Sequence, residues 1–221
     1  MFKGTSASAG IGIGKAVIVE EAELVITRNE VADAEAEIQR FKGALEKTIA
    51  ATQKMADDLA SRVGEKEAEI MQGHMMLLSD PMLTGEIENS VKNDKVNCEF
   101  AIENVCNMYA DMFASMGDEL MQQRATDMRD IKVRMQRTLM GLESVDVSLL
   151  PKGSILVAKD LTPSMTAGIN PENVSGIVTE LGGKTSHSAI LARALEIPAV
   201  VAVNGLMDAV KDGDKVVLDG S

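Results

Sequence analysis

The spacing of apolar residues divides the chain into two kinds of sequence. Between residues 31 and 63, apolar side chains recur every three or four positions, which predicts a helix with one buried stripe that ends at Gly64. Pro81, with Asp80 as its cap, predicts the start of another helix. The same periodicity predicts helices over 66–78, 97–116 and 118–140. Four or five helices joined by short turns favour a small antiparallel bundle.

The two flanks of the chain have a different pattern. Short β-branched runs bounded by Gly, Pro or Asp predict strands over 11–20, 154–158, 174–179, 199–203 and 215–218. Helical patterns separate some of these strands, at 163–169 and 185–195. A single strand is not stable alone, so we expect the first strand to pair with strands after residue 150. The sequence thus predicts an α/β subdomain over 1–20 and 147–221, with a helical subdomain over 21–146 inserted into it.

Composition narrows the function classes. The 221 residues are 45% apolar but only 2% aromatic, so the core is built from Leu, Ile, Val, Ala and Met. The formal charge is -12 and no cluster of Lys and Arg is visible, which excludes an ordinary nucleic-acid binder. An acidic surface suits a basic protein partner, although the charge could equally serve only to keep the protein in solution.

The few cysteines and histidines do not form a metal-binding pattern. Cys98 and Cys106 are eight residues apart, and His74 and His187 are distant in sequence, so we expect no metal site and two reduced, half-buried thiols. The N-terminus lacks the apolar run of a signal peptide, and no segment is long and apolar enough for a transmembrane helix. We therefore expect a cytoplasmic protein without a membrane partner.

The residues from Glu180 to Arg193 follow a predicted strand and begin a predicted helix. Gly182 and Gly183 allow the backbone to approach a ligand, and Thr185 can cap the helix. His187 then falls in the first helical turn, where free N–H groups and the helix dipole favour an anion. A neutral imidazole is a good nucleophile, and its phosphoryl adduct is labile enough to be handed on.

A structural role for His187 is also open. On an ideal helix it shares an apolar face with Ile190, Leu191 and Ala194, as a satisfied core histidine would. Arg193 lies about 240° around the helix from His187 and should point away from it. The sequence alone assigns no role to three basic residues, namely Lys66, Lys184 and Arg193.

The run GGKTSHSAILARALEIPAVV closely resembles the phosphohistidine motif of three enzyme groups: Enzyme I of the sugar phosphotransferase system, pyruvate phosphate dikinase and phosphoenolpyruvate synthase. Four other segments are similar to Enzyme I: KGTSASAGIGIGKAVI, EAEIMQGHMMLLSDPML, RATDMRDIKVRMQRTLMGL and DLTPSMTAGIN. The whole chain therefore resembles the N-terminal domain of Enzyme I. The resemblance implies a swivelling phosphohistidine α/β subdomain with an inserted helical bundle.

The resemblance also implies roles for individual residues. His187 would accept a phosphoryl group at Nε2 from phosphoenolpyruvate and pass it to HPr, a small histidine phosphocarrier protein. Thr166 matches the threonine that hydrogen-bonds the unphosphorylated imidazole. The positions that match the phosphate loop are Gly182, Gly183, Thr185 and Ser186. The positions that match the HPr-docking surface are Ile70, Met71, His74, Leu77, Leu83 and Arg124.

Several expectations concern parts of the enzyme beyond Ser221. By the resemblance, a C-terminal domain binds phosphoenolpyruvate and Mg²⁺ and forms the homodimer, so we expect this fragment to be monomeric, without a cofactor, and inactive with phosphoenolpyruvate alone. Two alternatives remain: the phosphohistidine domain of a dikinase or synthase, and a non-catalytic helical interaction module. We expect His74 to be exposed. The Met-bearing stripe of Met71, Met75, Leu78 and Met82 could fill the bundle core or form an adaptable docking patch.

Overall fold

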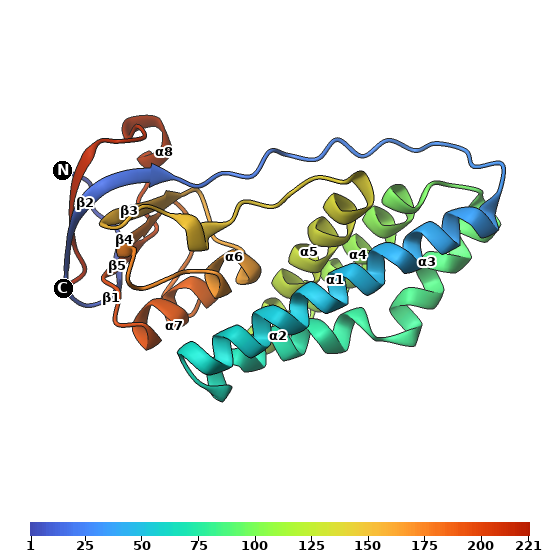
Figure 1. The fold of residues 1–221 in the computed structure, drawn as a ribbon, viewed down its shortest axis with the longest axis horizontal. Coiled ribbons are helices and arrows are strands. Elements are labelled where there is room, and N and C mark those ends of the chain that lie inside the picture. The colour runs from blue at the N-terminus through green and yellow to red at the C-terminus, as the bar shows by residue number, and fades with distance from the viewer. The chain divides into compact units, whose positions relative to one another are not determined.

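The computed structural model describes all residues 1–221, which form two compact units (Figure 1). The α/β unit comprises Met1–Glu21, Leu59–Glu67 and Val145–Ser221. The helical unit comprises Ala22–Asp58 and Ala68–Ser144. The α/β unit therefore joins segments from both ends of the chain and also includes Leu59–Glu67, which the sequence pattern assigned to the helical subdomain.

A six-stranded mixed sheet forms the centre of the α/β unit. Its strands are β1 (Thr5–Ser8), β2 (Ile11–Ile18), β3 (Ser154–Ala158), β4 (Val174–Thr179), β5 (Ala199–Val201) and β6 (Lys215–Asp219). They lie in the order β1-β5-β4-β3-β2-β6. The four central strands are parallel, and β1 and β6 are antiparallel edge strands. Because β2 lies between β3 and β6, the expected pairing of the first strand with strands after residue 150 is confirmed.

Helices cover both faces of this sheet. On one face, α6 (Pro163–Ala167) and α7 (His187–Ala194) pack against a cluster that includes Leu156 and Ile177. On the other face, the short helix α8 (Leu206–Ala209) packs with Ile155 and Val157. Alternate residues of β3 thus enter two different cores, which explains why this strand is apolar on both faces. Figure 1 shows α7 and α8 on opposite sides of the sheet.

Five helices make up the predicted bundle: α1 (Ala34–Arg62), α2 (Glu65–Leu78), α3 (Pro81–Asp94), α4 (Cys98–Ser115) and α5 (Glu119–Met140). Their boundaries follow local signals. Asp80 accepts a hydrogen bond from the Met82 amide and caps α3, as predicted, and Asp118 caps α5 in the same way. A membrane span needs a long apolar helix, and the structure contains no helix that meets both requirements.

The core of the helical unit is aliphatic and rich in methionine. Its largest fully buried side chains include Phe41, Ile87, Ile102, Met128 and Ile131. Cys98 and Cys106 are free thiols but are completely buried, so the expectation that they are half-buried was wrong. The reason is that α4 packs against both α3 and α5, so the residues on its inner faces, Cys98 and Cys106 among them, are buried.

Candidate functional site

The loops that follow β3 and β4 meet at the carboxyl edge of the parallel strands. The Leu181 amide donates to the Lys159 carbonyl at 2.8 Å, and the Leu181 carbonyl accepts from the Thr179 hydroxyl at 2.6 Å and from the Ala202 amide at 3.3 Å. These bonds fix the start of the loop from Leu181 to Ser186, which we call the glycine loop. In open α/β sheets, ligands bind outside this edge of the strands.

Two glycines follow this anchored start, for different reasons. Gly182 has φ +100°, a conformation in which any other residue would be strained. Gly183 has no such constraint, and a Cβ atom there would meet nothing within 4 Å. The loop then folds back, because the Ser186 amide and hydroxyl both donate to the Gly183 carbonyl, at 3.1 Å and 2.8 Å.

His187 is the first residue of α7 and is half-buried, so its predicted place in the first turn is confirmed. The predicted cap was wrong. Ser186, not Thr185, is the N-cap, and its hydroxyl oxygen accepts from the Ala189 amide at 3.3 Å. The helix begins two residues later than the apolar pattern suggests, so capping moves from Thr185, which is exposed, to Ser186. Both hydroxyls still flank the start of the helix.

Thr166 lies on α6, which packs against α7. Its side chain is 2% exposed, and its hydroxyl donates to the Thr162 carbonyl at 2.7 Å. A hydroxyl has one proton, so in this arrangement Thr166 Oγ1 can only accept a further hydrogen bond. An imidazole N–H is a suitable donor for it.

Asp160 is a titratable group at the same edge that the sequence did not single out. It follows β3, and its carboxylate accepts from the Leu161 amide at 2.9 Å. Burial raises the pKa of Asp160, and the Leu161 amide offsets part of this effect. As a residue Asp160 is exposed, so its carboxylate is only partly shielded from water. Nothing in the sequence separates it from the other aspartates, because this shielding depends on how the loops pack.

In the helical unit, the structure corrects the expectation for His74. The ring is completely buried between α2 and α5. Its Nε2 lies 3.1 Å from Asp127 Oδ1, and its Nδ1 lies 4.0 Å from Asp130 Oδ2. The two aspartates are one turn apart on α5, so they supply a carboxylate on each side of the ring. A polar ring that has such partners can be buried.

Two other predicted docking residues, Met71 and Leu83, are also buried, so they cannot line an exposed surface in this structure. Their apolar side chains fill space between elements instead. Three predicted residues keep partial exposure: Ile70, Leu77 and Arg124. Met82, which the Met-bearing stripe included, is exposed. Other exposed apolar residues of this unit were not singled out by the sequence, among them Met76, Met108, Met112, Met116 and Leu120.

Arg124 is held in a defined place on the helical unit. Its Nη1 is 3.4 Å from Asp127 Oδ2, and the other oxygen of Asp127 contacts His74. Its guanidinium also lies directly on α2, where a Cβ atom at Gly73 would collide with it. Gly73 thus gives the guanidinium of Arg124 room to lie against α2, and a larger residue there would displace the end of the Arg124 side chain.

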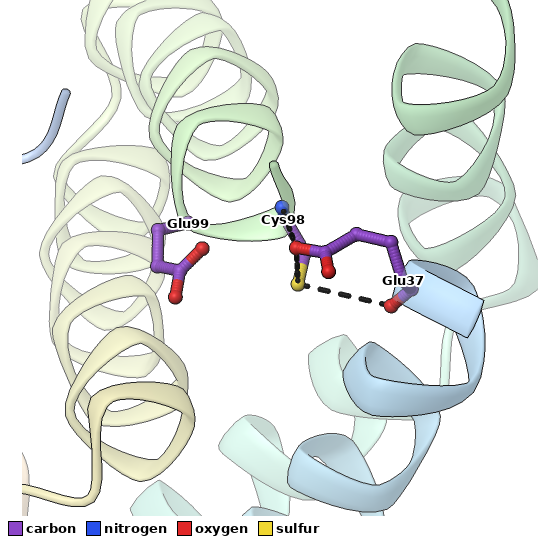
Figure 2. A group of neighbouring side chains, drawn as sticks. All are labelled: Glu37, Cys98 and Glu99. Atoms are coloured by element: carbon purple, nitrogen blue, oxygen red, sulfur yellow. Dashed lines mark hydrogen bonds between the residues drawn. The ribbon is translucent and has the colours of Figure 1, made fainter. Parts of the chain in front are cut away.

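Glu37, Cys98 and Glu99 bring three possible metal ligands within 4.8 Å of one another (Figure 2). Hydrogen bonds account for the arrangement. Glu37 Oε1 accepts from the Cys98 amide at 2.9 Å and from its thiol at 3.0 Å, so a residue of α1 caps α4. Arg40 pairs with both glutamates and supplies the positive charge. Burial raises the pKa of the Cys98 thiol, which keeps it protonated.

Comparison with known proteins agrees with these observations. Residues 3–124 match the family described as "PEP-utilising enzyme, N-terminal", and residues 150–221 match "PEP-utilising enzyme, mobile domain", where PEP is phosphoenolpyruvate. The chain belongs to the family of phosphoenolpyruvate-utilising enzymes. The second match contains the whole loop and helix that carry His187.

Two relatives are named phosphoenolpyruvate-protein phosphotransferase. The Bacillus subtilis protein is 41% identical and the Listeria monocytogenes protein 43% identical, each over 219 residues or 99% of this chain. The chain spans 38% of the length of both relatives.

The fold also matches solved structures. An NMR structure described as Enzyme I (nEIt) has 40% identity and a TM-score of 0.85 over 100% of this chain and 90% of that one. The "N-terminal domain of Enzyme 1 - Nitrogen" shares the fold at 24% identity, with a TM-score of 0.65. The expected resemblance to the N-terminal domain of Enzyme I, and the expected fold class, are confirmed.

Proposed function

We propose that this chain carries a phosphoryl group on His187 during transfer from phosphoenolpyruvate to the protein HPr. The observation that supports this most directly is the position of His187. It begins α7 at the carboxyl edge of the sheet, after a glycine loop whose backbone is fixed by hydrogen bonds. The relatives are named phosphoenolpyruvate-protein phosphotransferase, and this name agrees with such a role.

The proposed reaction has two in-line displacements. The Nε2 lone pair of His187 attacks the phosphorus of phosphoenolpyruvate, a P–N bond forms, and the P–O bond to enolpyruvate breaks. Enolpyruvate leaves and takes up a proton to become pyruvate. A histidine nitrogen of HPr then attacks the phosphorus, and the P–N electron pair returns to Nε2. Positioning of the reacting groups supplies most of the rate in such transfers.

Groups around His187 serve these steps in the proposal. For attack, Nε2 must be unprotonated, so the ring proton lies on Nδ1. Thr166, whose hydroxyl already donates to the Thr162 carbonyl, orients the resting ring by accepting a hydrogen bond from the imidazole. The first-turn amides of α7 and the hydroxyls of Thr185 and Ser186 offset the charge of the phosphoryl group. Gly182 and Gly183 let the loop backbone approach it.

HPr docking is assigned in this proposal to the helical unit. The exposed methionines Met76, Met82 and Met112 supply flexible apolar contacts, since methionine adapts to a partner surface. Ile70, Leu77 and Arg124, which are partly exposed, also contact HPr in this proposal, whereas Met71, His74 and Leu83 are buried and do not contact it. The acidic surface of the chain attracts a basic partner.

The remaining steps belong to the longer enzyme. In the proposal its C-terminal part binds phosphoenolpyruvate and Mg²⁺ and forms the homodimer, and the whole protein works in the cytoplasm. The 221 residues alone then exchange a phosphoryl group with phosphorylated HPr but do not react with phosphoenolpyruvate. Efficient labelling of the chain by phosphoenolpyruvate alone would contradict this division of roles.

The test is phosphorylation of the 221-residue chain by radiolabelled phospho-HPr. We expect one acid-labile phosphoryl group, lost completely in His187→Ala, with an unchanged circular dichroism spectrum as the folding control. Label that persists on another residue would show that the site is wrong. NMR titration with unphosphorylated HPr tests the docking assignment, which requires shifts within 65–130 and around His187.

A further inference from the structure

Arg193, to which the sequence assigned no role, joins three segments of the α/β unit. It lies in the last turn of α7. Its Nη1 atom donates to the Ala7 carbonyl of β1 at 2.9 Å and to the Lys184 carbonyl of the glycine loop at 3.0 Å. A single nitrogen therefore links β1, the loop before α7, and α7 itself.

Both carbonyls lie where the backbone is irregular. The pairing of β1 with β5 shifts register between Ser6 and Ser8, so Ala7 is left out of the paired positions. Lys184 lies inside the turn closed by the bond from Ser186 to Gly183. A carbonyl outside a ladder still needs a hydrogen-bond donor, and a guanidinium gives a stronger bond than a neutral donor.

The β1 end of this link is itself well fixed. Thr5 and Ser6 pair with β5, and the Ser6 hydroxyl donates to the Gly220 carbonyl at 2.6 Å. Ser8 extends the contact to α7, with its hydroxyl 3.5 Å from the Ala192 carbonyl. Arg193 thus connects the loop to a strand that is held independently of the loop.

The link to Arg193 restrains the glycine loop after its first residue. Its start is anchored at Leu181, but Gly182 and Gly183 come next and have the most freedom of any residues. Lys184 is held just after them and three residues before His187. We propose that Arg193 is a positioning residue for phosphoryl transfer, because its hold on the Lys184 carbonyl fixes the start of α7 and thereby His187. This inference rests on the proposed function of His187.

Arg193 acts in this proposal through the backbone and not on the phosphoryl group. It is six residues after His187, or about 240° around α7, so the two side chains leave the helix on different sides. Both N–H groups of its Nη1 atom are used by backbone carbonyls. Removing it should therefore affect the geometry of His187 and leave its charge environment nearly unchanged.

The kinetic test compares Arg193→Met, Arg193→Lys and a matched control, Arg28→Met, in phosphoryl exchange with phospho-HPr. Arg28 is exposed and lies outside the α/β unit. We expect kcat of Arg193→Met to fall about tenfold through loss of positioning, with KM for HPr unchanged. Arg193→Lys should recover part of the rate, because one ammonium can supply both bonds. Arg28→Met should match the parent chain.

A second measurement does not depend on phosphoryl transfer. Amide hydrogen exchange at Lys184, Thr185 and Ser186 should quicken in Arg193→Met, while exchange in β3 stays the same. Unchanged kcat in Arg193→Met, with or without faster loop exchange, would overturn the positioning role. If the parent chain takes no label but loop exchange still quickens, then the proposed function of His187 fails while the link between Arg193 and the loop stands. If Arg193→Met does not fold, Arg193→Gln replaces it.

Discussion

The two units of this chain bury different kinds of polar side chain. In the α/β unit, the buried polar residues are hydroxyls only, on Ser8, Ser154, Thr166, Thr179 and Ser188. In the helical unit, buried ionisable groups are present on His74, Asp127, Asp130, Arg134 and Arg137. Hydroxyls can be satisfied by nearby carbonyls, whereas buried charges need specific partners on other helices.

This difference shows how each unit holds its shape. The parallel strands satisfy their own backbone groups, so apolar packing completes the α/β unit. The backbone hydrogen bonds of a helix are internal to it, so contacts between neighbouring helices are made by side chains. Asp127 joins α5 to α2 through His74, and Arg134 joins α5 to α1 through a 2.7 Å bond to the Thr52 hydroxyl. The helical unit should therefore respond to pH and to loss of charge, and the α/β unit to loss of volume.

The largest expected effect is the loss of volume from the sheet. Leu156 is completely buried on β3, and Leu156→Ala should lower the free energy of unfolding of the α/β unit by about 3 kcal/mol. Urea unfolding at pH 7 and pH 5 should give the same loss, because no charge is involved. Val217→Ala, at a position 71% exposed on β6, is the control and should change stability by less than about 0.5 kcal/mol.

Loss of a buried carboxylate should be the next largest effect. Asp127→Ala leaves the buried His74 ring without its 3.1 Å partner and releases Arg124, so the helical unit should lose about 2 kcal/mol. Hydrogen exchange in α2 and α5 measures this loss. Asp111→Ala is the matched control, because that side chain is 82% exposed. If Asp127→Ala and Asp111→Ala lost the same stability, the helical unit would not depend on its buried charges as we infer.

A smaller effect tests which residue caps α7. Ser186→Ala removes the hydroxyl that accepts from the Ala189 amide, and should destabilise the first turn of α7 by about 1 kcal/mol. Thr185→Ala should be nearly neutral, since Thr185 is exposed and precedes the cap. Amide exchange at Ala189 and Ile190 distinguishes the two. A larger loss in Thr185→Ala would restore the cap expected from the sequence.

The smallest expected effect is the response to mild acid. Burial by itself would raise the pKa of Glu99, but hydrogen bonds led by that from Arg40 hold it below its ordinary value of 4.5. Burial would likewise raise the pKa of Glu103. Hydrogen bonds from Gln136, Lys132 and Asn107 outweigh this effect and hold the pKa below 4.5. A carboxyl with a lowered pKa stabilises the fold above its ordinary value, and this contribution is lost as the pH falls through the lowered pKa.

The helical unit should therefore weaken below about pH 4.5. Asp160 in the α/β unit has the opposite sign, because burial raises its pKa above 3.8 and the folded form binds the proton more readily. Amide exchange at pH 7 and pH 4 should show helical-unit amides losing more protection than sheet amides. The double variant Glu99→Gln with Glu103→Gln should reduce that difference. A greater loss in the sheet would contradict the assignment.

Signals that act over a few residues were predicted correctly. Asp80 with Pro81 marks the start of α3, and Gly117 separates α4 from α5. The loop and His187 were also found, since the glycines and the start of α7 are adjacent in sequence. Strand β1 was missed, because Thr5–Ser8 has no apolar alternation and is a strand only through its pairing with β5.

The sequence by itself determined the two kinds of element, the place of His187 at the start of a helix, and the family, because periodicity, capping and motif all act between neighbouring residues. Only the tertiary structure decided that His74 is buried and that Arg193 holds the loop. A charged or polar side chain is stable inside a protein only when a partner reaches it. The partners of His74 lie more than 50 residues along the chain, and one partner of Arg193 lies 186 residues away.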